Sequence, residues 1–113
     1  MFAGVDNDAT IAREEIFGPV MSVIPFSSVD EVVAMSNDNE YGLAAAVWTN
    51  DVKKAMLTAR ALRAGVVWIN DSQPAPTETP WGGYKQSGIG RELGREGLDD
   101  YLESKHIYVN LAD

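Results

Sequence analysis

The chain has 113 residues, enough for one small domain but too few for the two-domain cleft that is typical of dinucleotide-dependent enzymes. Its 17 acidic and 9 basic residues give a net charge of −8, which repels phosphate backbones and argues against nucleic-acid partners. The absence of cysteine excludes disulfides and thiolate chemistry, and the single histidine, His106, argues against a zinc site built from this chain alone.

Hydrophobic residues make up 45% of the sequence and charged residues 23%, the balance of an ordinary globular protein. The longest apolar run falls far short of the ~20 residues that a membrane helix needs. Residues 1–6 lack the basic segment that opens a signal peptide. We therefore expect a cytoplasmic protein that has no membrane partner.

The first regular elements are predicted for residues 20–37. The apolar run over residues 20–26, which contains Pro25, predicts a strand that ends at the proline. Ser28 and Glu31 have the spacing of a capping box. Apolar side chains at near-helical spacing follow them, so we expect a helix that ends near Asn37.

A second helix and two further strands are predicted downstream. Residues 43–49 form a continuous apolar run, which is typical of a strand buried on both faces. Thr49 or Asn50 is suited to cap a helix over residues 51–63, and residues 65–69 predict another strand. The expected inner face of that helix consists of Val52, Met56, Ala59 and Leu62.

The resulting order, strand-helix-strand-helix-strand, predicts an α/β fold with parallel strands and right-handed crossovers. We expect one three-stranded sheet that continues into further chain. Residues 71–90 are predicted to form a long loop, and residues 91–103 a helix that Gly94 and Gly97 weaken or help to pack closely. Apolar and polar residues alternate over 106–111, which predicts a half-buried strand with nothing after it to pair with.

Residues 14–20 form the most distinctive local pattern. Glu14 and Glu15 precede Phe17 and a Gly-Pro turn. A carboxylate in this place accepts hydrogen bonds from sugar hydroxyls, and Phe17 offers a face for stacking on a flat ring. On these residues alone, the plain alternative of an acidic loop with a core phenylalanine is favoured over a ligand site.

Two glycine-rich stretches follow the last predicted sheet strand. Trp81 stands beside Gly82 and Gly83, so it either faces a ligand that approaches the loop closely or anchors the loop on the core. The glycines of residues 88–94 miss the G-x-G-x-x-G spacing by one residue and follow a loop. We interpret them as turn glycines and not as a phosphate cradle.

Taken together, four segments resemble the aldehyde dehydrogenase superfamily, and the similarity covers essentially the whole chain. Residues 72–74, Trp81 and the tail are most similar to the betaine aldehyde and aminoaldehyde dehydrogenases. The four segments, in family order, are residues 14–20, 41–47, 65–70 and 81–94.

The resemblance implies a role for individual residues. Glu15 is similar to a glutamate that hydrogen-bonds the nicotinamide-side ribose, and Phe17 to the aromatic that packs at that end of NAD, with NADP as the alternative cofactor. Trp81 is similar to an aromatic that lines the aldehyde tunnel. Glu92 resembles an accessory glutamate that relays protons near the active site.

The resemblance also implies contacts between subunits. Arg91 and Glu103 are similar to a charge pair across an interface. Residues 106–111 resemble a strand that extends a sheet in the oligomer. We therefore divide the chain into part of a catalytic domain (1–105) and an oligomerisation strand (106–113), with interface residues His106, Ile107, Tyr108 and Val109.

In the superfamily a cysteine attacks the aldehyde and a glutamate acts as general base, and neither can be placed in this sequence. We therefore expect the chain to be the C-terminal portion of an NAD(P)-dependent aldehyde dehydrogenase and to be inactive by itself. The whole enzyme would oxidise betaine aldehyde, an aminoaldehyde or another aldehyde to its carboxylate. Its partners would be the aldehyde, the N-terminal portion of the enzyme and other subunits. The alternative is a non-catalytic module that pairs with full-length subunits.

Overall fold

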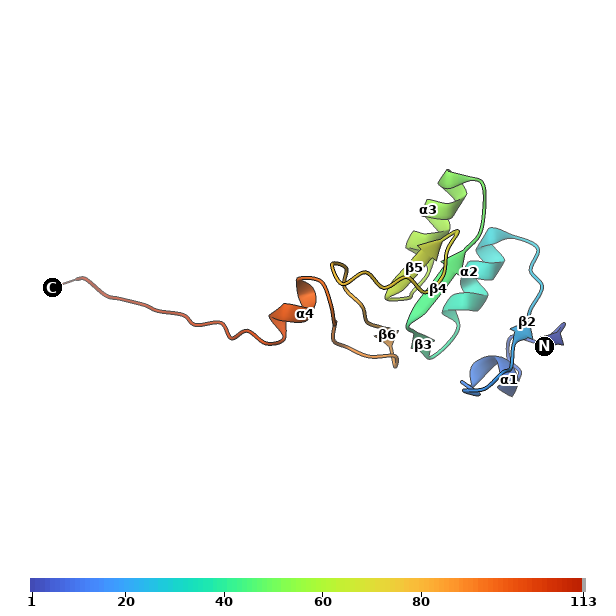
Figure 1. Ribbon diagram of the computed structural model, residues 1–113, viewed down its shortest axis with the longest axis horizontal. Coiled ribbons are helices and arrows are strands. Elements are labelled where there is room, and N and C mark those ends of the chain that lie inside the picture. The colour runs from blue at the N-terminus through green and yellow to red at the C-terminus, as the bar shows by residue number, and fades with distance from the viewer. Residues whose placement is uncertain (113) are drawn as a thin grey trace.

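The computed structural model describes residues 1–112, and Figure 1 shows a folded body from which the C-terminal segment extends. The principal extents are 76 × 32 × 26 Å, and the extended segment accounts for the long axis. The elements are β1 (Phe2–Ala3), α1 (Thr10–Arg13), β2 (Ser22–Val23), α2 (Val29–Asn37), β3 (Tyr41–Gly42), β4 (Ala44–Val47), α3 (Val52–Ala61), β5 (Val66–Ile69), β6 (Tyr84–Lys85) and α4 (Glu96–Asp99).

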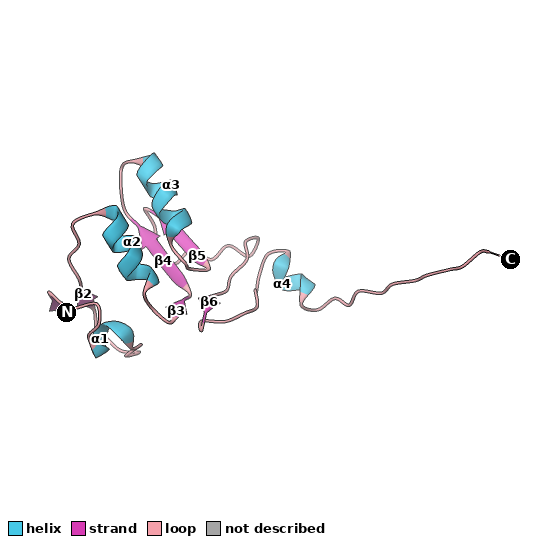
Figure 2. Cartoon of the chain, turned by 180° about the vertical axis from the view of Figure 1, so that it is seen from behind, coloured by secondary structure: helices cyan, strands magenta, loops and turns pink. Residues whose placement is uncertain are grey.

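A β4-α3-β5 unit forms the centre of the body. The two strands are parallel, with Ala44 opposite Val66 and Val47 opposite Ile69, as the sequence predicts. Helix α3 packs on both strands, and α2 lies beside α3 (Figure 2). The expected α/β class with a parallel crossover is therefore confirmed for this part of the chain.

The start of each long helix is fixed by a side chain. Ser28 accepts a hydrogen bond from the backbone N–H of Glu31 at 3.1 Å and caps α2 as predicted. The other half of the predicted capping box differs, because the Glu31 carboxylate accepts from the N–H of Ser27 at 2.7 Å, one residue before the cap. At α3 the predicted cap was wrong. Asp51, and neither Thr49 nor Asn50, caps the helix by accepting from the N–H of Lys54 at 2.9 Å, because an aspartate oxygen in this place reaches the third N–H of the helix.

The predicted inner face of α3 is half correct. Ala55 and Thr58 are the side chains buried against the strands, and their small size lets the helix approach closely. Val52 is 76% exposed and Met56 is 44% exposed, so both face away from the strands. The other two predicted residues, Ala59 and Leu62, are half-buried.

The prediction of one three-stranded sheet was wrong for the described residues. The strands form three separate pairs, and β2 pairs in parallel with β1 at the N-terminus instead of joining β4 and β5. β3 pairs antiparallel with β6, which lies inside the predicted long loop. Residues 1–24 and the β4-α3-β5 unit are thus two bodies with separate strand pairs.

The predicted helix over residues 91–103 is also corrected, because only α4 is helical in this stretch. Leu93 and Gly94 have φ values of 61° and 57°, left-handed conformations that end any helix passing through them. Gly97 packs closely, since a Cβ there would lie 2.8 Å from the carbonyl carbon of Glu92. Residues 106–111 are exposed and pair with no strand within residues 1–112, so the predicted oligomerisation strand stays a prediction.

None of the helices in residues 1–112 combines the length and the apolar character that crossing a membrane requires.

Candidate functional site

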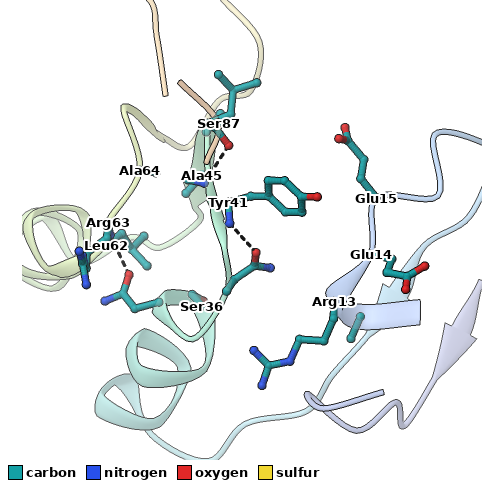
Figure 3. A pocket seen from close by; sticks show the side chains of 16 residues that line it. Arg13, Glu14, Glu15, Ser36, Tyr41, Ala45, Leu62, Arg63, Ala64 and Ser87 are labelled. Atoms are coloured by element: carbon teal, nitrogen blue, oxygen red, sulfur yellow. Dashed lines mark hydrogen bonds between the residues drawn. The ribbon is translucent and has the colours of Figure 1, made fainter. Parts of the chain in front are cut away.

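The acidic segment of the sequence lies directly after α1. Glu14 and Glu15 are exposed, and they line one wall of a hollow of about 470 Å³ between residues 1–24 and the β4-α3-β5 unit. In Figure 3 the ring of Tyr41 points from β3 toward Glu15 across this hollow. The two carboxylates therefore face open space, where they can accept hydrogen bonds from a ligand or from further protein.

Phe17 extends from the same loop into solvent. Its residue is 92% exposed, so the interpretation as a core phenylalanine was wrong. The backbone at Phe17 has a φ of 55°, a left-handed conformation that is uncommon for an aromatic residue. The loop therefore presents an exposed aromatic face two residues after the Glu15 carboxylate, a pairing suited to a flat ring and to hydroxyl donors.

The wall of the 470 Å³ hollow that faces Glu15 contains β3, and two short hydrogen bonds hold this strand in place. The N–H of Tyr41 donates to the side-chain oxygen of Asn39 at 2.8 Å, and the N–H of Gly42 donates to the hydroxyl of Ser87 at 3.0 Å. Ser87 belongs to the glycine-rich segment that carries Trp81. The hollow is therefore bordered by the acidic loop and by the downstream end of the Trp81 segment.

Trp81 borders a second hollow, of about 240 Å³. Its ring lies 5.9 Å from the ring of Trp68, with an interplanar angle of 41°. Pro74, Pro80 and Leu93 complete much of the wall. Trp68 is predicted from the sequence only as a strand residue and not as a site residue, although its position shortly before the proline-rich loop is a usable signal.

Two backbone hydrogen bonds join Trp81 to Glu92. Each residue donates its N–H to the carbonyl of the other at 2.7 Å, as an isolated antiparallel bridge. Gly94 permits the close approach of this segment, because a Cβ there would lie 2.9 Å from the nitrogen of Pro80. The candidate tunnel residue and the candidate proton relay are therefore held together, while Glu92 itself stays exposed.

Arg91 is fixed by its own segment. Its guanidinium donates to the carbonyls of Gly83 at 2.9 Å and Gly90 at 2.7 Å, and it lies 5.4 Å from the centre of the Tyr84 ring. Within residues 1–112 it makes no ion pair with Glu103. The predicted Arg91–Glu103 pair joins two subunits, so it stays a prediction.

The structure thus brings some of the predicted site residues together and keeps others apart. Glu15 and Phe17 share one loop, and Trp81 and Glu92 share one bridge. Glu15 and Trp81 line different hollows.

Comparison with known proteins identifies the class. A sequence model described as the aldehyde dehydrogenase family matches residues 1–107. The chain belongs to this family, which confirms the resemblance found in the sequence.

Individual relatives are similar along almost the whole chain. The betaine aldehyde dehydrogenase of Bacillus subtilis is 53% identical over 110 residues, 97% of this chain and 22% of that protein. Aldehyde dehydrogenase (NAD(P)+) 1 of Saccharomyces cerevisiae is 47% identical over 112 residues, 99% of this chain and 22% of that protein. The crystal structure of betaine aldehyde dehydrogenase from Staphylococcus aureus in complex with NAD+ gives a TM-score of 0.91 at 52% identity, over 93% of this chain and 21% of that one. The chain therefore spans about a fifth of the length of these relatives.

Proposed function

We propose that these residues form the C-terminal part of an NAD-dependent aldehyde dehydrogenase, with NADP as the alternative cofactor. The observation that carries the proposal is the 53% identity with a betaine aldehyde dehydrogenase over 97% of the chain. The TM-score of 0.91 with a relative bound to NAD+ supports it at the level of the backbone.

In this proposal Glu15 and Phe17 bind the cofactor. The carboxylate of Glu15 accepts hydrogen bonds from the ribose beside the nicotinamide, and Phe17 packs against that end of the molecule. The bound cofactor supplies the hydride acceptor for oxidation of the aldehyde. Support comes from the exposure of both side chains on one loop and from the left-handed backbone that presents Phe17.

Trp81 and Glu92 serve the substrate side. Trp81 lines the path of the aldehyde, and Glu92 relays protons as an accessory residue. We propose betaine aldehyde or an aminoaldehyde as substrate, because the hollow beside Trp81 has two indole walls that suit a cationic group. The reaction also needs a nucleophilic cysteine and a general base, and the 113 residues contain no cysteine, so other parts of the enzyme supply the nucleophile.

Residues 106–111 are proposed to add a strand to a neighbouring subunit. Ile107 and Val109 are 77% and 66% exposed, so apolar side chains are available along this segment. The same observation favours the second candidate function, a non-catalytic module that pairs with full-length subunits. The two candidates differ in whether these residues support catalysis when the rest of an enzyme is present.

A chimera tests this difference. The aligned 110-residue segment of the Bacillus subtilis relative is replaced by this chain, and NADH formation is measured with betaine aldehyde. We expect turnover comparable with the parent relative, and loss of turnover when Glu15→Gln and Phe17→Ala are combined. A folded chimera that binds neither NAD nor aldehyde would favour the non-catalytic module.

A further inference from the structure

The carboxyl end of α2 receives contacts from three separate segments. We call residues Asn37, Asp38 and Asn39 the α2 junction. The ammonium of Lys85 donates to the carbonyls of Asn37 at 2.9 Å and Asn39 at 2.8 Å. The guanidinium of Arg13 donates to the carboxylate of Asp38 at 2.7 Å and also to its carbonyl. Cations are favoured here because the last carbonyls of a helix carry partial negative charge.

Arg13 ends α1, directly before Glu14 and Glu15. Within residues 1–112, every hydrogen bond between residues 1–24 and the remainder of the chain comes from Arg13 to Asp38. Arg13 also donates to Asp8 inside its own body, which keeps the guanidinium oriented. Within the described residues, the hydrogen bonds of this one side chain therefore connect the proposed cofactor loop, residues 14–17, to the end of α2.

Lys85 makes the corresponding contact with the α2 junction for the substrate segment, the name we give to residues 81–92. It lies on β6 between Trp81 and Glu92, and its backbone is held at a φ of 54°. Gln86 adds a backbone bond to Glu40 at 3.0 Å, just after the junction. The side chain of Asn37 links the junction to the turn after α3, donating to Ala61 at 2.8 Å and accepting from Arg63 at 2.7 Å.

From these contacts we propose that the α2 junction fixes the separation between the cofactor loop and the substrate segment, with Arg13 and Lys85 as positioning residues. Arg13 reaches the junction from the cofactor side and Lys85 from the substrate side. Displacing either cation therefore displaces one half of the proposed site relative to the other. This inference rests on the proposed function for the assignment of one segment to the cofactor and the other to the substrate. The contacts with the α2 junction do not depend on that assignment.

The geometry is measured on the whole 113-residue chain, which has no native cysteine and accepts spin labels only where cysteine is introduced. Labels at Met21→Cys and Gln86→Cys, two exposed positions, report the distance between the two segments by double electron-electron resonance. The labelled chain is diluted into an excess of unlabelled chain, so that association between copies adds no intermolecular distances. We expect one narrow distance distribution, which Arg13→Gln broadens. Arg13→Lys, which keeps a cation between Asp8 and Asp38, should restore most of it. Arg60→Gln, at an exposed arginine on α3, should leave it unchanged.

A parent-like distribution in Arg13→Gln overturns the proposal. If Arg13→Gln loses its circular dichroism signal, Asp38→Asn decides, because it keeps the contacts of Arg13 with Asp8 and with the backbone. Broadening in a folded Asp38→Asn supports the proposal, and an unchanged distribution overturns it.

A kinetic measurement in the chimera separates positioning from general stability. Arg13→Gln should raise KM for NAD, and Lys85→Gln should raise KM for the aldehyde, with Lys85→Arg restoring most of the loss. If Arg13→Gln and Lys85→Gln each changed KM for NAD and KM for the aldehyde equally, the assignment of one cation to each segment would be contradicted. An inactive chimera would overturn the proposed function while the label distances still decide the role of the junction.

Discussion

The indole of Trp81 lies 5.9 Å from that of Trp68, and the two rings are held by different parts of the chain. Trp68 donates its ring N–H to the carbonyl of Pro74 at 2.9 Å, whereas Trp81 is fixed by its backbone bridge to Glu92. The described residues that line the hollow beside them include no charged side chain. The site therefore offers aromatic faces, which are the natural partner of a quaternary ammonium group that cannot donate ordinary hydrogen bonds.

This arrangement predicts a substrate-dependent effect at Trp81. In the chimera, Trp81→Ala should reduce kcat/KM for betaine aldehyde more than for an uncharged aldehyde of similar size. A cation–π contact contributes on the order of 0.5–2 kcal/mol once it is desolvated. Trp81→Phe should retain part of the preference. Equal losses for both aldehydes would identify Trp81 as a general wall of the tunnel.

Glu15 is expected to act on the cofactor and not on folding. Because the side chain is exposed and has no hydrogen-bond partner within residues 1–112, Glu15→Gln should change the melting temperature little. Hydrogen bonds to a charged group contribute about 1.5–3 kcal/mol, so NAD affinity in the chimera should fall by roughly tenfold to a hundredfold. Glu14→Gln is the matched control and should have a smaller effect. A large loss of stability with unaltered NAD affinity would contradict the assignment.

Asp38 should make the stability of the chain depend on acid pH. The hydrogen bond and the charge of Arg13, with a smaller contribution from Lys85, lower the pKa of Asp38 below its ordinary value of 3.8. The stabilisation is therefore present above pH 3.8 and is lost as the pH falls through the lower pKa of the folded state. Urea denaturation of the parent and of Asp38→Asn should show a difference at pH 6 that narrows below pH 3.8. A difference that is constant with pH would show that the carboxylate charge is not involved.

The isolated chain should self-associate. The segment over residues 106–111 has unpaired backbone groups and apolar side chains, and Leu111 is 88% exposed. Sedimentation velocity at roughly tens of micromolar should show oligomers. Ile107→Lys with Val109→Lys should shift the chain toward monomer more strongly than Asn110→Lys, which places its charge on the other side of the strand. A stable monomer of the parent chain would contradict this prediction.

The sequence predicts those parts of the fold that local patterns determine. Spacing and apolar runs along neighbouring residues predict the Ser28 cap of α2, the parallel strands of the central unit and their crossover helix. The pairing of β2 with β1 could not be predicted in this way. β1 has two residues, too few to carry a period, and its partner is chosen by tertiary contacts.

In the candidate site, too, local sequence patterns predict the residues, whereas tertiary contacts decide their partners. The residue types at Glu15, Phe17 and Trp81 are visible as motifs, but the partners of Trp81 are not. Its contact with Trp68 depends on how the loop over residues 71–80 folds back on the central strands. The predicted helix over residues 91–103 was wrong because the left-handed backbone at Leu93 is set by its surroundings and carries no sequence signal.

Aldehyde-dependent NADH formation tests the central claim most directly. The purified chain is assayed with betaine aldehyde and NAD, alone and mixed with the part of the Bacillus subtilis relative outside the 110 aligned residues. The sequence has no cysteine to attack the aldehyde, so we predict no turnover by the chain alone and measurable turnover by the mixture. Turnover by the pure chain alone would contradict the account. So would the absence of turnover in both the mixture and the chimera.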